Sequence, residues 1–346
     1  MNGILRSCLL LGVAALVPLT LHAAEVTGAG ASSPRAVYLK WAAAYGKASG
    51  NTINYQSIGS GGGVKEVSAK SVDFGASDIP LTESELEKRG LVQFPVLVGA
   101  AVPFVNLPDV KPGELRLSGP LLADIFRGRL TRWDDSRIKD LNPGVSLPAM
   151  SIVVVRRDDG AGVSFLLTHY LSKASPEWRD NIGTGTAVQW PVGLGGKGDE
   201  GVANFVKRLP GAIGYVEYGY ARANQLAYVS MQNRSGAFVQ PDEKSLSAAA
   251  QSAEWAKTGY GEVLSDQPSP DAWPIAGASF ILLQRKTDKL PQAAAVVKFF
   301  EWSYANGAKI ALEGGYVPLP NATASQIKGA WESIRDPSGK TIASVQ

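Results

Sequence analysis

Cysteine and histidine are nearly absent from this sequence, which has one cysteine and two histidines among its 346 residues. Cys8 and His22 stand near the N-terminus, so only His169 lies in the body of the chain. Disulfides and thiol catalysis require cysteine, and most zinc sites draw on several cysteine or histidine ligands. We therefore expect no disulfide and no metal site, and no stretch of the sequence indicates a cofactor.

His169 is the only residue that could serve a Ser-His-Asp hydrolase. It falls within Phe165–Leu171, an apolar stretch with helical spacing, where a structural histidine is the alternative interpretation. No paired nucleophile and base emerge from the remaining residues. The sequence therefore predicts a protein that is not an enzyme.

Neither sign of charge predominates, because 34 basic and 31 acidic residues leave a formal net charge of +3. Proteins that bind nucleic acid or an acidic membrane surface usually carry a marked excess of positive charge. We expect no nucleic-acid partner.

A short hydrophobic run, Cys8–Leu21, follows Arg6 and precedes the small residues Ala23 and Ala24. Its length falls below the roughly 17 to 25 residues of a membrane-spanning helix, which is the alternative interpretation. The pattern is typical of a secretory signal peptide, and we expect residues 1–24 to have that role.

The stretch 151–165, SIVVVRRDDGAGVSF, combines a strand, a charged turn and a glycine loop that leads into a helix. The β-branched residues Ile152–Val155 predict a buried strand, and helical spacing follows Gly162. The first N–H groups of such a helix are unpaired and lie at the positive end of its dipole, with an arginine alongside. This order favours an oxyanion site, and the alternative is a surface turn whose charges pair with each other.

Two earlier stretches repeat the order of strand, loop and helix. The first ends in Ser32 and Ser33, either of which could cap the helix that follows, and the second is the glycine-rich Ser57–Glu66. The second stretch has neither the P-loop pattern nor the dinucleotide-binding spacing. Helix capping and a flexible linker are the alternatives to loops whose hydroxyls and amides face one space.

Asp78 follows another predicted strand and precedes an acidic helix start. It could simply cap that helix. If it faces the other three loops instead, a lone carboxylate beside an anion site makes chemical sense only when the ligand carries a proton for it to accept.

The order of predicted elements indicates an α/β protein with two lobes, which suits a chain of this length because domains usually have roughly 100 to 200 residues. Two long apolar runs that contain proline, Gln93–Asn106 and Pro274–Leu283, predict strands that cross between the lobes. We expect residues 25–100 and 276–346 to form lobe I, and residues 101–275 to form lobe II. Each lobe is expected to contain mixed sheet flanked by helices.

Seven stretches resemble the periplasmic phosphate-binding proteins that deliver phosphate to ABC transporters. They are TGAGA at 27–31, NYQSIGSGGGVKE at 54–66, VDFGASD at 72–78, VVRRDDGAG at 154–162, WPVGLGGKG at 190–198, LPGAIGYVEY at 209–218 and DAWPI at 271–275. The resemblance implies a type II periplasmic-binding-protein fold in which helix N-termini hold an anion between two lobes. It also implies a monomer in the periplasm and a membrane permease as its partner.

The resemblance further implies a set of phosphate ligands. They are Ser32, Ser33, Ser60, Asp78, Arg157, Ala161, Gly162 and Val163, with Asp159 orienting Arg157. In this scheme the carboxylate of Asp78 accepts the proton of hydrogen phosphate and repels fully ionised sulfate.

Three of these positions depart from the family. Ala161 and Val163 stand where the family has hydroxyl groups, and Ser33 stands where it usually has an aromatic residue. Hydrogen bonds to charged groups contribute roughly 1.5 to 3 kcal/mol each, so two lost bonds could weaken affinity by about a hundred- to ten-thousandfold. We expect phosphate capture for an ABC importer, and the alternatives are another oxyanion, a phosphonate or organophosphate ligand, or a role as a periplasmic sensor or adhesion protein.

Overall fold

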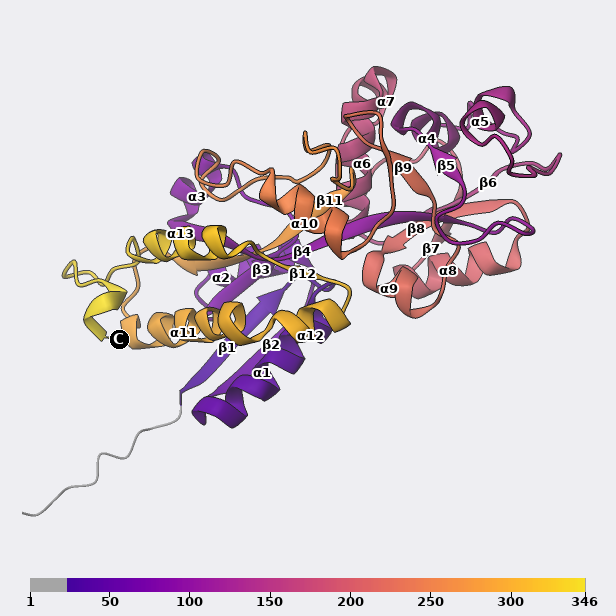
Figure 1. The fold of residues 1–346 in the computed structure, drawn as a ribbon. Coiled ribbons are helices and arrows are strands. Elements are labelled where there is room, and N and C mark those ends of the chain that lie inside the picture. The colour runs from indigo at the N-terminus through magenta and orange to yellow at the C-terminus, as the bar shows by residue number, and fades with distance from the viewer. Residues whose placement is uncertain (1–23, 346) are drawn as a thin grey trace, which may run out of the picture.

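The computed structural model describes residues 24–345, and the expected signal peptide lies almost entirely outside this range. The described residues form two groups of elements that are joined by one long strand (Figure 1). None of the described helices has both the length and the apolar character needed to cross a membrane.

A mixed sheet of nine strands runs through both groups in the order β2-β1-β3-β11-β4-β8-β6-β7, and β12 pairs with β4 outside this path. Its strands are β1 (Glu25–Gly30), β2 (Thr52–Ser57), β3 (Phe74–Ser77), β4 (Leu91–Val105), β6 (Val153–Arg157), β7 (Leu194–Gly196), β8 (Ala212–Glu217), β11 (Ala276–Gln284) and β12 (Val317–Pro318). A smaller sheet has the order β10-β9-β5, with β5 (Arg116–Leu117), β9 (Ser230–Gln232) and β10 (Phe238–Val239).

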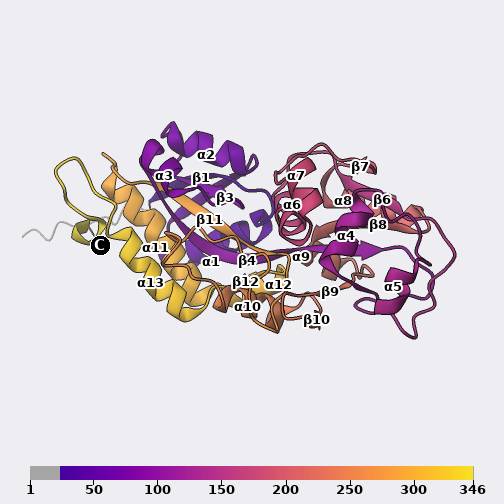
Figure 2. The same cartoon turned by 90° about the horizontal axis from the view of Figure 1, so that it is seen from above.

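The helices divide between the two groups. Around β1, β2, β3 and β11 lie α1 (Arg35–Ser49), α2 (Ser60–Ser68), α3 (Glu83–Arg89), α11 (Leu290–Asn306), α12 (Ala308–Glu313) and α13 (Asn321–Trp331). Around β6, β7 and β8 lie α4 (Gly119–Phe126), α5 (Ser136–Leu141), α6 (Gly162–Ala174), α7 (Pro176–Asn181), α8 (Gly198–Arg208) and α9 (Tyr218–Ala223). Helix α10 (Glu243–Gln251) lies beside β4, and η1 (Ile342–Val345) follows α13. We call these groups the β1 side and the β6 side, and both views separate them (Figure 2).

Strand β4 connects the two sides. Its fifteen residues are all buried, as its apolar sequence predicts for a strand covered on both faces. Residues 91–100 pair with β11, and residues 101–105 pair with β8. The crossing strand predicted at Gln93–Asn106 is therefore confirmed.

The second predicted crossing strand behaves differently. Strand β11 begins at Ala276, and it pairs with β3 and with residues 91–100 of β4, all on the β1 side. The chain reaches it through Ile275, whose carbonyl accepts a hydrogen bond from the amide of Ala101. The chain therefore re-enters the β1 side next to Ala100 and Ala101, where β4 changes its pairing from β11 to β8. Strand β11 itself does not cross between the two sides.

Aromatic residues hold α1 and α11 against the sheet on the β1 side. Tyr38, Trp41 and Tyr45 recur at helical spacing in α1 and are buried, as the amphipathic pattern of this stretch leads us to expect. Tyr38 lies with its ring centroid 5.1 Å from that of Tyr55, and Tyr45 lies 5.4 Å from Phe299 of α11. The C-terminal segment thus completes the core that begins with β1 and α1.

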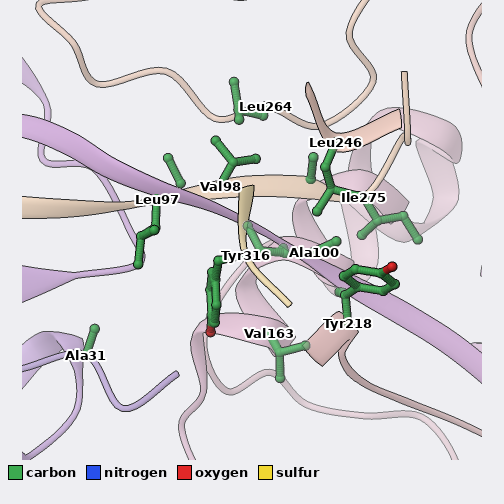
Figure 3. Close-up of a cluster of buried hydrophobic side chains, with 14 of the residues drawn as sticks. Ala31, Leu97, Val98, Ala100, Val163, Tyr218, Leu246, Leu264, Ile275 and Tyr316 are labelled. Atoms are coloured by element: carbon green, nitrogen blue, oxygen red, sulfur yellow. The ribbon is translucent and has the colours of Figure 1, made fainter. Parts of the chain in front are cut away.

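A cluster of buried side chains continues this core across β4 (Figure 3). It includes Leu97, Val98 and Ala100 of β4, and both Val163 and Tyr218 of the β6 side contribute to it. The sheet and its core therefore extend without interruption between the two sides.

Candidate anion-binding site

One cavity of about 260 Å³ is lined by residues at or just after the ends of four strands, β1, β2, β3 and β6, and by Thr186. Its lining residues are Ser32, Ser33, Ile58, Gly59, Ser60, Gly61, Gly62, Asp78, Arg157, Asp159, Gly160, Ala161, Gly162 and Thr186. This set contains every predicted ligand residue except Val163, and it also contains Asp159. The structure thus brings together the predicted residues from stretches that lie far apart in the sequence.

Three helices begin at the cavity. α1 starts at Arg35 after β1, α2 starts at Ser60 after β2, and α6 starts at Gly162 after β6. None of these three has a side-chain hydrogen bond at its N-cap, whereas α3 has a complete capping box. Since the first amides of a helix have no partner within it, uncapped N–H groups remain available to an anion.

The capping interpretation of the first loop is wrong. Pro34 occupies the N-cap position of α1 and offers no side-chain hydrogen bond. The Ser32 hydroxyl instead accepts a 2.8 Å hydrogen bond from the Ser57 hydroxyl, and Ser32 and Ser33 both line the cavity.

The two other structural alternatives for these loops also fail. Gly61, Gly62 and Gly63 lie inside α2, so the second loop is not a flexible linker. Thr82, not Asp78, caps α3 and closes a capping box with Glu85. Asp78 is therefore free to face the cavity.

Arg157 is held by two carboxylates. Its Nε and Nη2 atoms donate to Asp159 Oδ1 and Oδ2 at 2.7 and 2.6 Å, and its Nη1 donates to Asp199 Oδ1 at 2.8 Å. The side chain is only 11% exposed, so these are not the surface pairs of the alternative interpretation. A guanidinium has five N–H donors, and two remain for a ligand in the cavity.

Arg157 also sets the ionisation of its partner. Its hydrogen bonds to Asp159, aided by the backbone amide of Gly198, lower the pKa of the Asp159 carboxyl to about 2. Asp159 therefore stays ionised at neutral pH and fixes the plane of the guanidinium. The orienting role of Asp159 remains a prediction that this geometry favours.

Asp78 reaches from the end of β3 to the N-terminus of α6. Its Oδ2 atom would lie 2.6 Å from a Cβ atom at position 162, so only glycine fits there without displacing the carboxylate. Its backbone amide donates to the Ser60 hydroxyl at 3.0 Å. Burial raises the pKa of Asp78 to about 6, although hydroxyls of Ser279 and Ser33 lower it in part.

Val163 does not line the cavity. Its side chain is 1% exposed and belongs to the buried cluster near Tyr316 (Figure 3). A hydroxyl at this position would point into the core in the described conformation. The structure thus leaves Val163 only its backbone N–H, in the first turn of α6, as a group for a ligand.

His169 also lies away from the cavity, in α6 beyond its first turn. Its Nδ1 atom hydrogen-bonds with the Ser265 hydroxyl, and burial lowers the pKa of its imidazole to about 4. The histidine is neutral at physiological pH and has the structural environment that the sequence analysis offered as an alternative to catalysis.

Several residues of the site carry no clear signal in the sequence. Thr186 lines the cavity, and its carbonyl accepts a 3.1 Å hydrogen bond from the amide of Ala161. Asp199 lies in the first turn of α8 and reaches Arg157 from there. Asp199 follows one of the stretches that carry the family resemblance, which is the signal that could have drawn attention to it.

Comparison with known proteins places the chain in a family. Residues 20–306 match the PBP superfamily domain. The phosphate-binding protein PstS of Haemophilus influenzae is 49% identical over 313 residues, which cover 90% of this chain and 94% of the relative. PstS of Pasteurella multocida is 47% identical over 339 residues, covering 97% and 98% of the two chains.

Solved structures agree in fold. The phosphate-binding protein from Stenotrophomonas maltophilia has a TM-score of 0.63 at 22% sequence identity, over 88% of this chain and 93% of that one. This likeness confirms the α/β periplasmic-binding-protein fold that the sequence predicts. By sequence, the chain belongs to the PstS phosphate-binding proteins within the PBP superfamily.

Proposed function

We propose that this protein captures inorganic phosphate in the cavity at the N-termini of α1, α2 and α6, and delivers it to the permease of an ABC importer. The observation that carries the proposal is the meeting of Arg157, Asp78 and three uncapped helix N-termini around one cavity. Membership of the PstS proteins supports it, and it agrees with the prediction that the chain is not an enzyme.

The charges around the cavity favour hydrogen phosphate over other anions. Arg157 brings one positive charge, but Asp159 and Asp199 both pair with it. Side-chain charge alone therefore does not attract an anion, and the attraction depends on helix amides and on the two free N–H groups of Arg157. Asp78 then requires a ligand that can donate a proton, which hydrogen phosphate has and fully ionised sulfate lacks.

We infer that the two lobes have the boundaries expected from the sequence, with residues 25–100 and 276–346 in lobe I and 101–275 in lobe II. The partner change of β4 between Ala100 and Ala101 supports this division. Ser32, Ser60 and Asp78 would then come from lobe I, and the Arg157 loop from lobe II. A ligand between them would draw the lobes together, as in other hinge-closing proteins.

We place the protein in the periplasm as a monomer. The signal-peptide pattern of residues 1–24 supports export, and the related proteins of solved structure include one described as a periplasmic phosphate-binding protein. The membrane permease is the partner that such a carrier requires.

Ala161 favours a second candidate ligand. It lines the cavity without a hydroxyl, and it stands beside a space of about 260 Å³. A phosphonate or a phosphate monoester has an apolar or bulkier fourth substituent that such a surface could accept. This candidate uses the same Arg157 and helix amides.

Calorimetry on protein stripped of ligand distinguishes these candidates, with phosphate, sulfate, methylphosphonate and phytate as titrants. We expect phosphate to bind with a Kd below about 10 μM, corresponding to a free energy below roughly −7 kcal/mol. If phosphate does not bind and methylphosphonate or phytate does, the result supports the second candidate ligand instead of phosphate. If none of the four anions binds, the result contradicts both candidate ligands.

Replacing Ala161 by serine should improve both stability and affinity. Ala161 is the N-cap of α6 and makes no side-chain cap, and a serine there contributes about 1 kcal/mol to helix stability. The new hydroxyl would also face the cavity, where a bond to an anion contributes roughly 1.5 to 3 kcal/mol. Thermal unfolding and calorimetry measure the two effects.

A matched control for this variant is Ser118→Ala, which removes an existing N-cap from α4, outside the cavity. It should lower the unfolding temperature while leaving phosphate affinity unchanged. An Ala161→Ser protein with no gain in affinity would mean that position 161 does not face the bound anion.

A further inference from the structure

Thr186 brings a hydroxyl to the cavity from the segment between α7 and β7. On the β6 side the described lining consists of Arg157, Asp159, Gly160, Ala161, Gly162 and Thr186. Thr186 is the only one of these six residues with a hydroxyl group, and the hydroxyls of Ser32, Ser33 and Ser60 all come from the β1 side. Among these lining residues, a hydroxyl contact to an anion from the β6 side therefore has to come from Thr186.

The Thr186 hydroxyl lies beside the loop that follows Arg157. A Cβ atom at Gly160 would lie 3.6 Å from Thr186 Oγ1 and 4.0 Å from Thr186 Cβ. Within the described part of the chain, and apart from the chain neighbours of Gly160, no other heavy atom comes within 4 Å of that point. The hydroxyl is thus the part of Thr186 nearest to Gly160, and the space beside it is open.

Hydrogen bonds hold this segment against α6. The carbonyl of Thr186 accepts a 3.1 Å hydrogen bond from the amide of Ala161, the N-cap residue of α6. The amide of Gly185 donates to Thr168 Oγ1 at 3.1 Å, and the hydroxyls of Thr184 and Ser172 lie 3.0 Å apart. Because Thr168 and Ser172 both belong to α6, Thr186 has a fixed position relative to the N-terminus of that helix.

The Thr186 hydroxyl is available to a ligand. Thr184 Oγ1 pairs with Ser172, whereas Thr186 Oγ1 has no hydrogen-bond partner within residues 24–345. The amide of Ala161 is already occupied by the Thr186 carbonyl, and the alanine side chain has no donor. At this corner of the cavity, the Thr186 hydroxyl is the group that remains to donate a hydrogen bond.

We propose that the Thr186 hydroxyl donates a hydrogen bond to the bound anion and takes the place of the hydroxyl that Ala161 lacks. Thr186 is then a further ligand residue that determines specificity, because a donor at this corner favours an oxygen of inorganic phosphate over the apolar substituent of a phosphonate. Thr186 lies outside the seven stretches that carry the family resemblance. The inference rests on the proposed function, since it names a further ligand residue of the same cavity.

Calorimetry with phosphate and stripped protein tests this role by comparing the wild type with Thr186→Val, which keeps the branched shape of the side chain and removes the hydroxyl. We expect the substitution to raise the Kd about ten- to a hundredfold, the effect of losing one hydrogen bond to a charged group. Thr186→Ser keeps the hydroxyl and should stay within about threefold of the wild type. A Thr186→Val protein that also stays within threefold would overturn the inference.

The matched control is Thr184→Val, which makes the same chemical change in the same segment but at a residue that does not line the cavity. It removes the hydrogen bond to Ser172 and should leave the phosphate Kd within about threefold of the wild type. If Thr184→Val weakened binding as much as Thr186→Val, the effect would come from the position of the segment, and the ligand role would be refuted.

A double-mutant cycle with Ala161→Ser tests whether Thr186 substitutes for the missing hydroxyl. In the Ala161→Ser background a second hydroxyl serves the same corner, so Thr186→Val should raise the Kd less than about fivefold there. Equal losses in both backgrounds would show that the two hydroxyls act independently, which contradicts the substitution.

Competition calorimetry with methylphosphonate tests the specificity role. Thr186→Val should shift the ratio of the two affinities toward methylphosphonate by about tenfold, because a methyl group needs no donor at this corner. An unchanged ratio would contradict that role. A wild type that binds phosphate beside a Thr186→Val protein that binds it equally well would refute this inference alone, whereas a wild type that does not bind phosphate would refute the proposed function and the inference with it.

Discussion

Replacing Arg157 by alanine should weaken phosphate binding by about a hundred- to a thousandfold, the effect of losing roughly 3 to 4 kcal/mol. The side chain is 11% exposed, and its two remaining N–H groups are the cationic donors that the site offers to an anion. The change also leaves Asp159 and Asp199 without their partner, so two carboxylates would face the ligand unopposed. Calorimetry with stripped protein measures the loss.

The phosphate affinity of Arg157→Lys should lie between those of the wild type and the alanine variant. A lysine retains the charge, but its ammonium group cannot hold both carboxylates and a ligand in the planar geometry of a guanidinium. The matched control is Arg132→Ala, which removes a pair with Asp134 at the surface, where the arginine side chain is 51% exposed. That control should bind as the wild type does. An Arg157→Ala protein within threefold of the wild type would contradict the assignment of the arginine.

Loss of Arg157 should also change how stability depends on pH. The folded-state pKa of Asp159 is lowered to about 2, below the ordinary value near 3.9. This depression contributes stability that is present above pH 4 and disappears as the pH falls toward 2. In Arg157→Ala the acidic loss of stability should be smaller, because the pair that produced the depression is already absent.

Replacing Asp78 by asparagine should reverse the preference between phosphate and sulfate. The carboxylate accepts a proton from hydrogen phosphate, whereas an asparagine amide can donate to an anion that has no proton. We expect phosphate affinity to fall and sulfate affinity to rise, so that their ratio changes by about a hundredfold or more, the sum of two charge-assisted contacts. Competition calorimetry with both anions at pH 8 measures the ratio.

The raised pKa of Asp78 predicts how the selectivity between phosphate and sulfate depends on pH. The pKa of Asp78 is about 6, so wild-type protein at pH 5 carries a protonated carboxyl that can donate to sulfate. Sulfate binding by the wild type should therefore increase below pH 6, while Asp78→Asn should show no such increase. Asp140→Asn, which removes an exposed negative charge on α5, is the control and should retain wild-type selectivity. Unchanged selectivity in Asp78→Asn would refute the acceptor role.

Asp78→Asn should also stabilise the fold without ligand. Because the folded-state pKa is raised, Asp78 favours the folded state at low pH, and this contribution is lost as the pH rises from about 4 through 6. At pH 7 the buried charge costs about 2 to 3 kcal/mol, which the neutral amide does not incur. A higher unfolding temperature in the variant, with weaker phosphate binding, would show that the carboxylate is retained for function rather than stability.

The loops of the site were predictable from the sequence because their signals are local. Strand, glycine-containing loop and helix follow one another within about fifteen residues at Ser151–Phe165, and the structure has β6 and α6 there. The long apolar run of β4 likewise predicts a strand that is buried on both faces. The family resemblance then added which of these loops share one cavity.

The resemblance was less informative where helical geometry decides the direction of a side chain. Val163 matches a ligand position, yet Val163, Leu166, Leu167 and Tyr170 are all buried on the inner face of α6. Their spacing of three and four residues is the ordinary pattern of a core-facing stripe. The periodicity of this helix, taken alone, would have placed Val163 in the core.

Asp199 could not be predicted from local sequence. The hydrogen bond from Arg157 to Asp199 joins residues 42 positions apart. It connects the end of β6 to α8, which follows the neighbouring strand β7. Strand order of this kind depends on packing among distant segments, for which the sequence carries no short-range signal. Only the assembled sheet reveals that Arg157 has a second carboxylate partner.

The central claim is that phosphate binds in the cavity between Asp78 and Arg157. The most direct test is a crystal structure of protein that was stripped of ligand and then crystallised or soaked with phosphate. We expect one phosphate in the cavity, with an oxygen within hydrogen-bond distance of Asp78, another on Arg157, and the amides at the start of α2 and α6 directed at the remaining oxygens. Phosphate bound elsewhere, or bound in this cavity without contact to both Asp78 and Arg157, would contradict the account.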